Sequence, residues 1–279
     1  MYKESRNPFF DIQKETVITD SGIVVPNKQA LINAETKNVL GLVSPNYEVV
    51  TNGEVDDLFQ EAIKDLSIEK VVDHMDAETK RWKRQIVFND ERLNFEIVKS
   101  DIVGILLEIH NGFTGRTSFG YNLMGYRWIC ENGMVMGKKS LFSESYAHYV
   151  DSPEALRDSF NMKFENFQKT ADVWSSWSEI DFNRENFSLF VESHTKSTDV
   201  KSADQYVTPK VSEAIIESYE PMMNLHKLSE NKWGAFNVLT ALATHKTQAR
   251  NGSNLFSNRY NTINRLAADL YHWEDRKAA

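Results

Sequence analysis

The sequence predicts an α+β protein with a β-rich first half and a mostly helical second half. Over residues 1–150, short apolar runs alternate with turns rich in Gly, Pro and Asn, which is typical of strands. From residue 151 onward, apolar residues recur with a helical period. No low-complexity linker separates the two halves. We therefore expect a curved antiparallel sheet with one helix over 1–150, a helical region over 151–279, and one compact unit that contains both.

The strands of the first half are expected between turn signals, with one helix among them. Glu54–Leu66 repeats apolar residues at helical spacing and follows the turn signal Asn52-Gly53. Asn111-Gly112 is a second turn signal, of the kind found in hairpins. The expected strands are Gln29–Ile32, Leu40–Val43, an extended piece at Tyr47–Val50, Val71–His74, Lys80–Phe88, Leu93–Val98 and Ile102–His110.

The helical half opens with a strong start signal. Ser152-Pro153-Glu154 combines a capping hydroxyl, a proline in the first turn and an acid near the positive end of the helix dipole. A long helix is expected from there to about Trp177, and the polar stretch Thr195–Gln205 is expected to be a loop. The other expected helices are Glu185–Ser193, Pro209–Leu228, Lys232–Lys246 and Asn254–Trp273.

Composition limits the location and the partners of the protein. The chain has 279 residues, 41% apolar and 26% charged, with one cysteine and no run of about eighteen apolar residues. These features predict a cytoplasmic protein without a membrane partner and without an intrachain disulfide. The net charge of −8 is unfavourable for a protein that coats nucleic acid by charge alone.

The single cysteine, Cys130, lies in the stretch YRWICENGMVMG and is a candidate nucleophile. A nucleophilic thiol needs a lowered pKa, whereas the adjacent Glu131 would raise it. Tyr126, Trp128 and Cys130 alternate as they would in a half-buried strand. We therefore interpret Cys130 as a packed thiol at the end of a core strand, before a turn at Asn132-Gly133.

No motif in the chain indicates a cofactor, a metal or a catalytic site. The seven histidines show no chelating spacing, and the glycines form neither a phosphate-binding loop nor a dinucleotide fingerprint. We therefore expect no cofactor, no metal and a non-enzymatic protein, with a hydrolase built from carboxylates that converge in space as the least favoured alternative. Gly112 and Gly115 beside Arg116 predict either a small anion-binding turn or a simple β-turn.

The most informative feature is an uneven distribution of charge. The windows Asn231–Ala268 and His110–Cys130 contain no Asp or Glu, and in both of them cations are interleaved with aromatic residues. Such interleaving is typical of grooves that bind single-stranded nucleic acid, although core rings and cations paired with distant acids would look the same. The candidate nucleic-acid contacts are Lys80, Arg81, Trp82, Lys83, Arg84, Arg116, Arg127, Lys246, Arg250, Arg259 and Arg265.

The basic cluster Lys80–Arg84 lies in an expected strand. Strand alternation places Lys80, Trp82 and Arg84 on one face and the remaining two cations on the other. A strand that is polar on both faces is expected at a sheet edge or in a protruding hairpin. Trp82 is the residue expected to stack on a base.

Three segments resemble the phage/plasmid-like protein family, a domain of unknown function. They are LGLVSPNYEVVTNGE, GYNLMGYRWICENGMVMG and NKWGAFNVLTALATHKTQAR, in this order along the chain. The residues that match the motifs of the family are Val43, Ser44, Tyr47, Val49, Val50, Asn52, Cys130, Asn132, Gly133, Trp233, Asn237 and Thr240. Phe113–Arg116 departs from the small polar turn that is usual in the family.

The resemblance implies a phage or plasmid origin, a bacterial host and a role beside DNA metabolism. Together with the charge pattern it favours a non-enzymatic protein that binds or anneals single-stranded DNA in recombination or replication, as a homo-oligomer. The alternative is a counter-defence protein that binds and inhibits a host protein, which suits the acidic net charge and the abundant aromatic residues.

Overall fold

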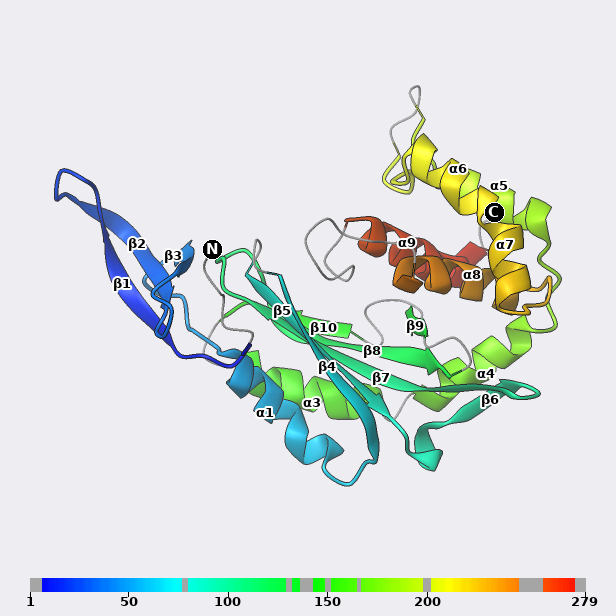
Figure 1. Cartoon of the computed structure of the whole chain (residues 1–279), viewed down its shortest axis with the longest axis horizontal. Coiled ribbons are helices and arrows are strands. Elements are labelled where there is room, and N and C mark those ends of the chain that lie inside the picture. The colour runs from blue at the N-terminus through cyan, green and yellow to red at the C-terminus, as the bar shows by residue number, and fades with distance from the viewer. Residues whose placement is uncertain are drawn as a thin grey trace. The chain divides into compact units, whose positions relative to one another are not determined.

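The computed structural model describes eight stretches of the chain and confirms the α+β class (Figure 1). In the described residues the strands precede Ala147, and all helices but α1 and one short 3₁₀ segment follow it. Among the same residues no helix is long and apolar enough to cross a membrane. The described residues are 7–76, 80–128, 132–135, 143–148, 152–164, 167–197, 202–245 and 258–273.

The chain forms two units that are interleaved in sequence. Strands β7 (Asp101–Gly112) and β8 (Phe119–Arg127) are each divided between the two units. The units therefore do not follow one another along the chain. The first unit contains Met1–Asn89, Leu107–Asn122 and Ser143–Phe164, and the second contains Asp90–Leu106, Leu123–Phe142 and Glu165–Ala279.

A small antiparallel sheet opens the first unit. It has the order β1-β2-β3, formed by Ile12–Ile18, Val24–Asn33 and Val39–Val43. Leu31 and Val43 pack with Phe113 in a buried cluster. The expected extended piece at Tyr47–Val50 joins no sheet. Instead, the amides of Glu48 and Val50 donate to the carbonyl and the Nδ1 of His148.

The larger sheet has seven strands. Its main order is β10-β8-β7-β5-β4, while β6 pairs with β7 and β9 pairs with β8. Strand β5 therefore lies between two neighbours, and the expectation of a sheet edge at Lys80–Arg84 is wrong. The alternative of a hairpin agrees with the antiparallel pairing of β4 and β5, which begins at Asp76 and Arg81. The bounds are β4 (Ile68–Asp76), β5 (Arg81–Phe88), β6 (Phe95–Val98), β9 (Asn132–Val135) and β10 (Ser143–Tyr146).

Three Asn-Gly pairs that were expected to form turns lie in regular elements. Asn52-Gly53 begins helix α1, because Thr51 and Glu54 form a capping box immediately before it. Asn111-Gly112 ends β7, where the Asn111 side chain donates to the carbonyl of Val50. Asn132-Gly133 lies in β9, paired with Arg127 and Tyr126 of β8. Cys130 lies outside the described residues.

Helices α1 (Asn52–Ile63) and α3 (Ser152–Phe164) cover one face of the larger sheet in the first unit (Figure 1). The rings of Phe59, Tyr121 and Phe160 meet edge to face with centroids 5.0–5.7 Å apart, so α1, β8 and α3 share one aromatic core. The opposite face of this part of the sheet carries polar side chains, among them Glu108 and Lys83.

In its described residues, the second unit contains six further α-helices. The expected helix Pro209–Leu228 is two helices that meet at Ser218, because Pro221 has no amide hydrogen to continue the hydrogen-bond ladder. The expected helix Ser152–Trp177 is likewise formed by α3 and α4. The bounds are α4 (Phe167–Trp177), α5 (Arg184–Ser193), α6 (Pro209–Glu217), α7 (Tyr219–Leu225), α8 (Lys232–His245) and α9 (Asn258–Asp269), with 3₁₀ segments at Glu91–Leu93 and Leu270–His272.

Candidate functional site

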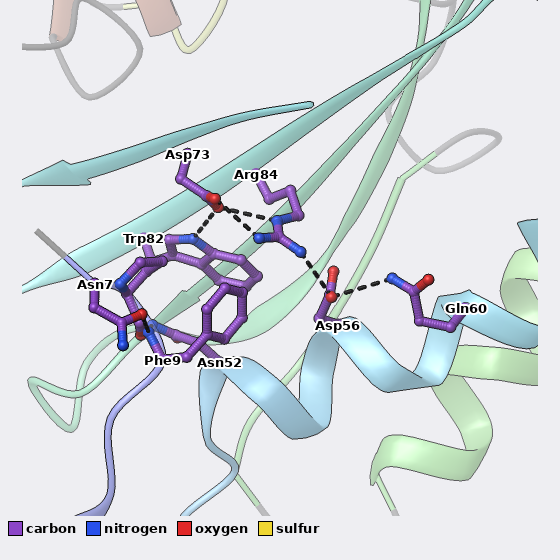
Figure 2. A network of polar contacts seen from close by, with 9 residues as sticks. Asn7, Phe9, Asn52, Asp56, Gln60, Asp73, Trp82 and Arg84 are labelled. Carbon is purple, nitrogen blue, oxygen red and sulfur yellow. Dashed lines mark hydrogen bonds and ion pairs between the residues drawn. The ribbon is translucent and has the colours of Figure 1, made fainter. Parts of the chain in front are cut away.

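The basic cluster on β5 is divided between the two faces of the sheet, as strand alternation predicted. On the face toward α1, Trp82 and Arg84 both donate to the carboxylate of Asp73 (Figure 2). Arg84 also donates to Asp56 of α1, with a nitrogen–oxygen distance of 2.7 Å. The ring of Phe9 lies 4.6 Å from the Arg84 guanidinium carbon.

These contacts make the α1-facing residues part of the interior. Trp82 is fully buried, so its ring offers no surface to a base, and we revise the expectation that it stacks on one. Burial opposes the charge of Arg84, but Asp73 and Asp56 outweigh that effect and raise its pKa. Burial raises the pKa of Asp56, and Arg84 counteracts this shift. Arg84 is therefore neutralised by protein carboxylates.

The other face of the sheet carries a buried carboxylate that organises several polar side chains. Glu108 of β7 is 1% exposed and accepts hydrogen bonds from Lys83, Gln85 and Asn122 at 2.8, 3.1 and 3.0 Å. Burial alone would raise the pKa of Glu108, but the ammonium of Lys83 holds it below its usual value. His74 of β4 lies nearby, and burial lowers its pKa. Lys83 is thus held by an ion pair.

Arg127 is likewise an interior residue. Its side chain is 4% exposed and makes two hydrogen bonds, of 2.7 and 2.9 Å, with the carboxylate of Asp101. The indole Nε1 of Trp233 donates to the same carboxylate at 2.9 Å. The motif residues Trp233, Asn237 and Thr240 are all buried in α8. These residues support the fold of the second unit.

The remaining candidate cations differ in their surroundings. Arg81 lies 3.8 Å from the carboxylate of Asp76, and Lys80 precedes β5 with a φ of 52°. Arg259 and Arg265 are both exposed on α9, where the Arg265 guanidinium lies 3.8 Å from the centre of the Tyr206 ring. Lys246 and Arg250 lie outside the described residues. The last candidate, Arg116, lies in the loop between β7 and β8 and is exposed.

Arg116 lines a pocket of about 460 Å³ within the first unit, which we call the basic pocket. Lys28 of β2 lines the same pocket, although it is far from Arg116 in sequence. The hydroxyl-bearing residues Ser44, Thr117 and Ser118 also line it. Among the lining residues in the described part of the chain there is no Asp or Glu. The pocket therefore combines two cations and three hydroxyls without an opposing carboxylate.

Two stacked rings and two aliphatic side chains complete the basic pocket. The rings of Tyr47 and His148 stack at 4.7 Å with an angle of 22°, and Leu42 and Val43 of β3 lie beside them. Burial raises the pKa of Tyr47 and lowers that of His148 to about 4, while the backbone carbonyls of Gly112 and Glu48 oppose the latter shift. Both rings are therefore uncharged near pH 7 and do not repel an anion in the pocket.

Two glycines let the loop that carries Arg116 approach β3 closely. Gly115 has a φ of 74°, which favours glycine, and a side chain there would lie 3.0 Å from the carbonyl oxygen of Leu42. At Gly41 an added Cβ would lie 2.3 Å from the carbonyl oxygen of Phe113. The sequence singled out Gly115 and Arg116 as a possible anion-binding turn. It gave no signal for Lys28, because only the fold brings β2 to this loop.

The buried imidazole of His148 predicts an acid-dependent loss of stability. The unfolded chain binds a proton at His148 near pH 6.5, whereas the folded protein resists it down to about pH 4. The free energy of unfolding should therefore fall by about 3 kcal/mol from this residue as the pH drops through that window. Urea denaturation at several pH values should show that the free energy of unfolding falls less steeply with pH in His148→Gln than in the wild type. If both proteins lose the same free energy of unfolding over this window, the lowered pKa of His148 is contradicted.

In the described ranges no three His, Cys, Asp or Glu side chains are arranged to hold a metal ion.

Comparison with known proteins bears on the family of the chain. No curated protein and no solved structure matches the chain. One family model matches residues 39–266, which is more than half of the chain. The match begins at β3 and ends within α9, and its description is "Domain of unknown function (DUF932)". By this match, the chain is a member of the DUF932 family.

Proposed function

We propose that the protein binds single-stranded DNA without catalysing a reaction, and that the basic pocket is a principal contact. The observation that carries the proposal is the convergence of Lys28 and Arg116 on one pocket, which has no carboxylate among its described lining residues. Cations that meet phosphates beside rings that meet bases are the elements of a single-strand binding site. The uncharged ring of Tyr47 and the aliphatic Leu42 supply the apolar part.

The finer proposal is that of a phage- or plasmid-encoded annealing protein that acts in recombination or replication as a homo-oligomer. It is supported by the resemblance of the three sequence segments and by the window Asn231–Ala268, which lacks acids and in which Arg259 on α9 is exposed. Lys83, Arg84 and Arg127 are left out of the proposed contacts, because each already forms an ion pair with a protein carboxylate.

The test is binding of a fluorescent oligonucleotide, measured by anisotropy over a range of salt concentrations. Arg116→Ala and Lys28→Ala should each weaken binding by about tenfold at low salt, since each removes one phosphate contact. Each should also make the plot of log affinity against log salt concentration less steep, by about 0.7. Lys99→Ala, which removes a charge from an exposed turn of the second unit and does not line the pocket, is the matched control. Absence of binding at low salt would refute the proposal.

A second candidate function, binding of a host protein, is favoured by one surface. At the tip of the β1–β2 hairpin, Ile18 and Val24 are paired across the strands, and Ile23 beside them is 65% exposed. Apolar side chains at an exposed tip are suited to a protein interface. A host protein that is retained by the wild type and lost with Ile18→Ser, Ile23→Ser and Val24→Ser combined would support this function. Equal retention by both proteins would count against it.

A further inference from the structure

We infer that the basic pocket is a site for a nucleotide with a terminal phosphate, that is, a phosphomonoester on a nucleoside, in preference to an internal phosphodiester of a continuous strand. This inference rests on the proposed function and makes it specific. The ligand is the phosphorylated end of a DNA strand or a free mononucleotide, which share the same chemistry.

The charge of the basic pocket favours a phosphomonoester. Lys28 and Arg116 reach the pocket from different segments, β2 and the loop after β7, and no described lining residue carries a negative charge. An internal phosphodiester carries one negative charge, whereas a phosphomonoester carries about −1.5 to −2 at pH 7 and offers three acceptor oxygens. Two cations in one pocket match the charge of the phosphomonoester.

The hydrogen-bond donors of the basic pocket also favour a phosphomonoester. Hydroxyls of Ser44, Thr117 and Ser118 line the same pocket as the two cations. Arg116 can present a fork of N–H groups and Lys28 a single ammonium, so the pocket can donate to several phosphate oxygens at once. A phosphomonoester has three such oxygens free, while a phosphodiester has only two.

The size and the lining of the basic pocket suit a single nucleotide. A volume of about 460 Å³ lies in the range of pockets that hold small molecules, about 300–1,000 Å³, and suits one nucleotide. Beside the cations, the stacked pair Tyr47–His148 and the half-exposed Leu42 provide an apolar wall for the base and the sugar.

The experiment compares one fluorescent oligonucleotide in three forms, with a 5′-phosphate, with a 3′-phosphate and with hydroxyls at both ends, together with competition by thymidine 5′-monophosphate. At least one phosphorylated form should bind about tenfold more tightly than the hydroxyl form, or the mononucleotide should displace the oligonucleotide. The probe that binds more tightly, or that displaces the oligonucleotide, identifies the source of the phosphate as the 5′ end, the 3′ end or a free nucleotide.

Variants and pH then connect the effect to the pocket. Arg116→Ala should abolish the preference for the phosphate, Arg116→Lys should retain part of it, and Lys99→Ala should leave it unchanged. Because the second pKa of a phosphomonoester is about 6, the preference should shrink as the pH is lowered from 7.5 to 5.

The outcomes separate the two proposals. Equal binding of all three oligonucleotides, with no displacement by the mononucleotide, would overturn the present inference and leave single-strand binding intact. A preference that survives Arg116→Ala would also overturn it. Failure of all the probes to bind at low salt would overturn the proposed function itself.

Discussion

Replacing Asp101 with alanine is expected to lower the free energy of unfolding by about 3–5 kcal/mol, the largest effect of any single substitution considered for this protein. The carboxylate of Asp101 accepts two hydrogen bonds from Arg127 and one from the indole of Trp233. Without it, a guanidinium that is almost fully buried keeps its charge and loses both hydrogen bonds to this carboxylate. Urea denaturation followed by circular dichroism measures the loss.

Two companion variants show that the cost arises from the unpaired charge. Asp101→Asn keeps the size of the side chain and an acceptor for Trp233, so it should lose less than the alanine variant. Asp101→Leu combined with Arg127→Met replaces both charges by apolar groups and should recover much of the stability. A loss below about 1 kcal/mol for Asp101→Ala would contradict the interior role of this ion pair.

Replacing Glu108 with leucine is expected to lower the free energy of unfolding by about 2–4 kcal/mol. This carboxylate accepts hydrogen bonds from Lys83, Gln85 and Asn122, which come from two neighbouring strands. The loss should be somewhat smaller than at Asp101, because the Lys83 side chain is 15% exposed and its ammonium keeps some contact with water. Thermal and urea denaturation should agree on the order of the two variants.

The pH dependence of stability provides an independent check on Glu108. Lys83 holds the pKa of Glu108 below the value of about 4.3 that it has in an unfolded chain. This residue therefore contributes stability above about pH 4.3, and the contribution is lost as the pH falls through the lower folded-state pKa. Glu108→Gln should lose less stability on acidification below pH 4.3 than the wild type. Lys83→Met should behave similarly, since it removes the charge that lowers the pKa.

Periodicity in the sequence was sufficient for most helices and strands. The apolar spacing of Glu54–Leu66 predicted α1, and the start signal at Ser152-Pro153 predicted α3, because capping and burial act within a few residues. The Asn-Gly pairs were misleading because a turn signal also acts only within a few residues. Their turn preference is a local energy of modest size, and capping at Thr51 or pairing of β8 with β9 outweighed it.

The candidate site was harder to predict, because charge alone does not show which cation has a partner. Arg84 and Arg127 looked like Arg116 in the sequence, yet their partners Asp56, Asp73 and Asp101 lie in other elements. Lys28 carried no local signal. Whether a cation faces a carboxylate or an open pocket depends on contacts between residues that are distant in the chain.

The sequence alone determined the α+β class, the change from strands to helices near residue 150, and the presence of cations in windows that lack acids. Those properties follow from short-range periodicity and composition, which each segment carries by itself. The fold, by contrast, buries Trp82 and pairs Lys83, Arg84 and Arg127 with carboxylates, and it brings Lys28 and Arg116 to one pocket. The physical reason is that burial and ion pairing depend on the approach of distant segments, and no local pattern encodes that approach.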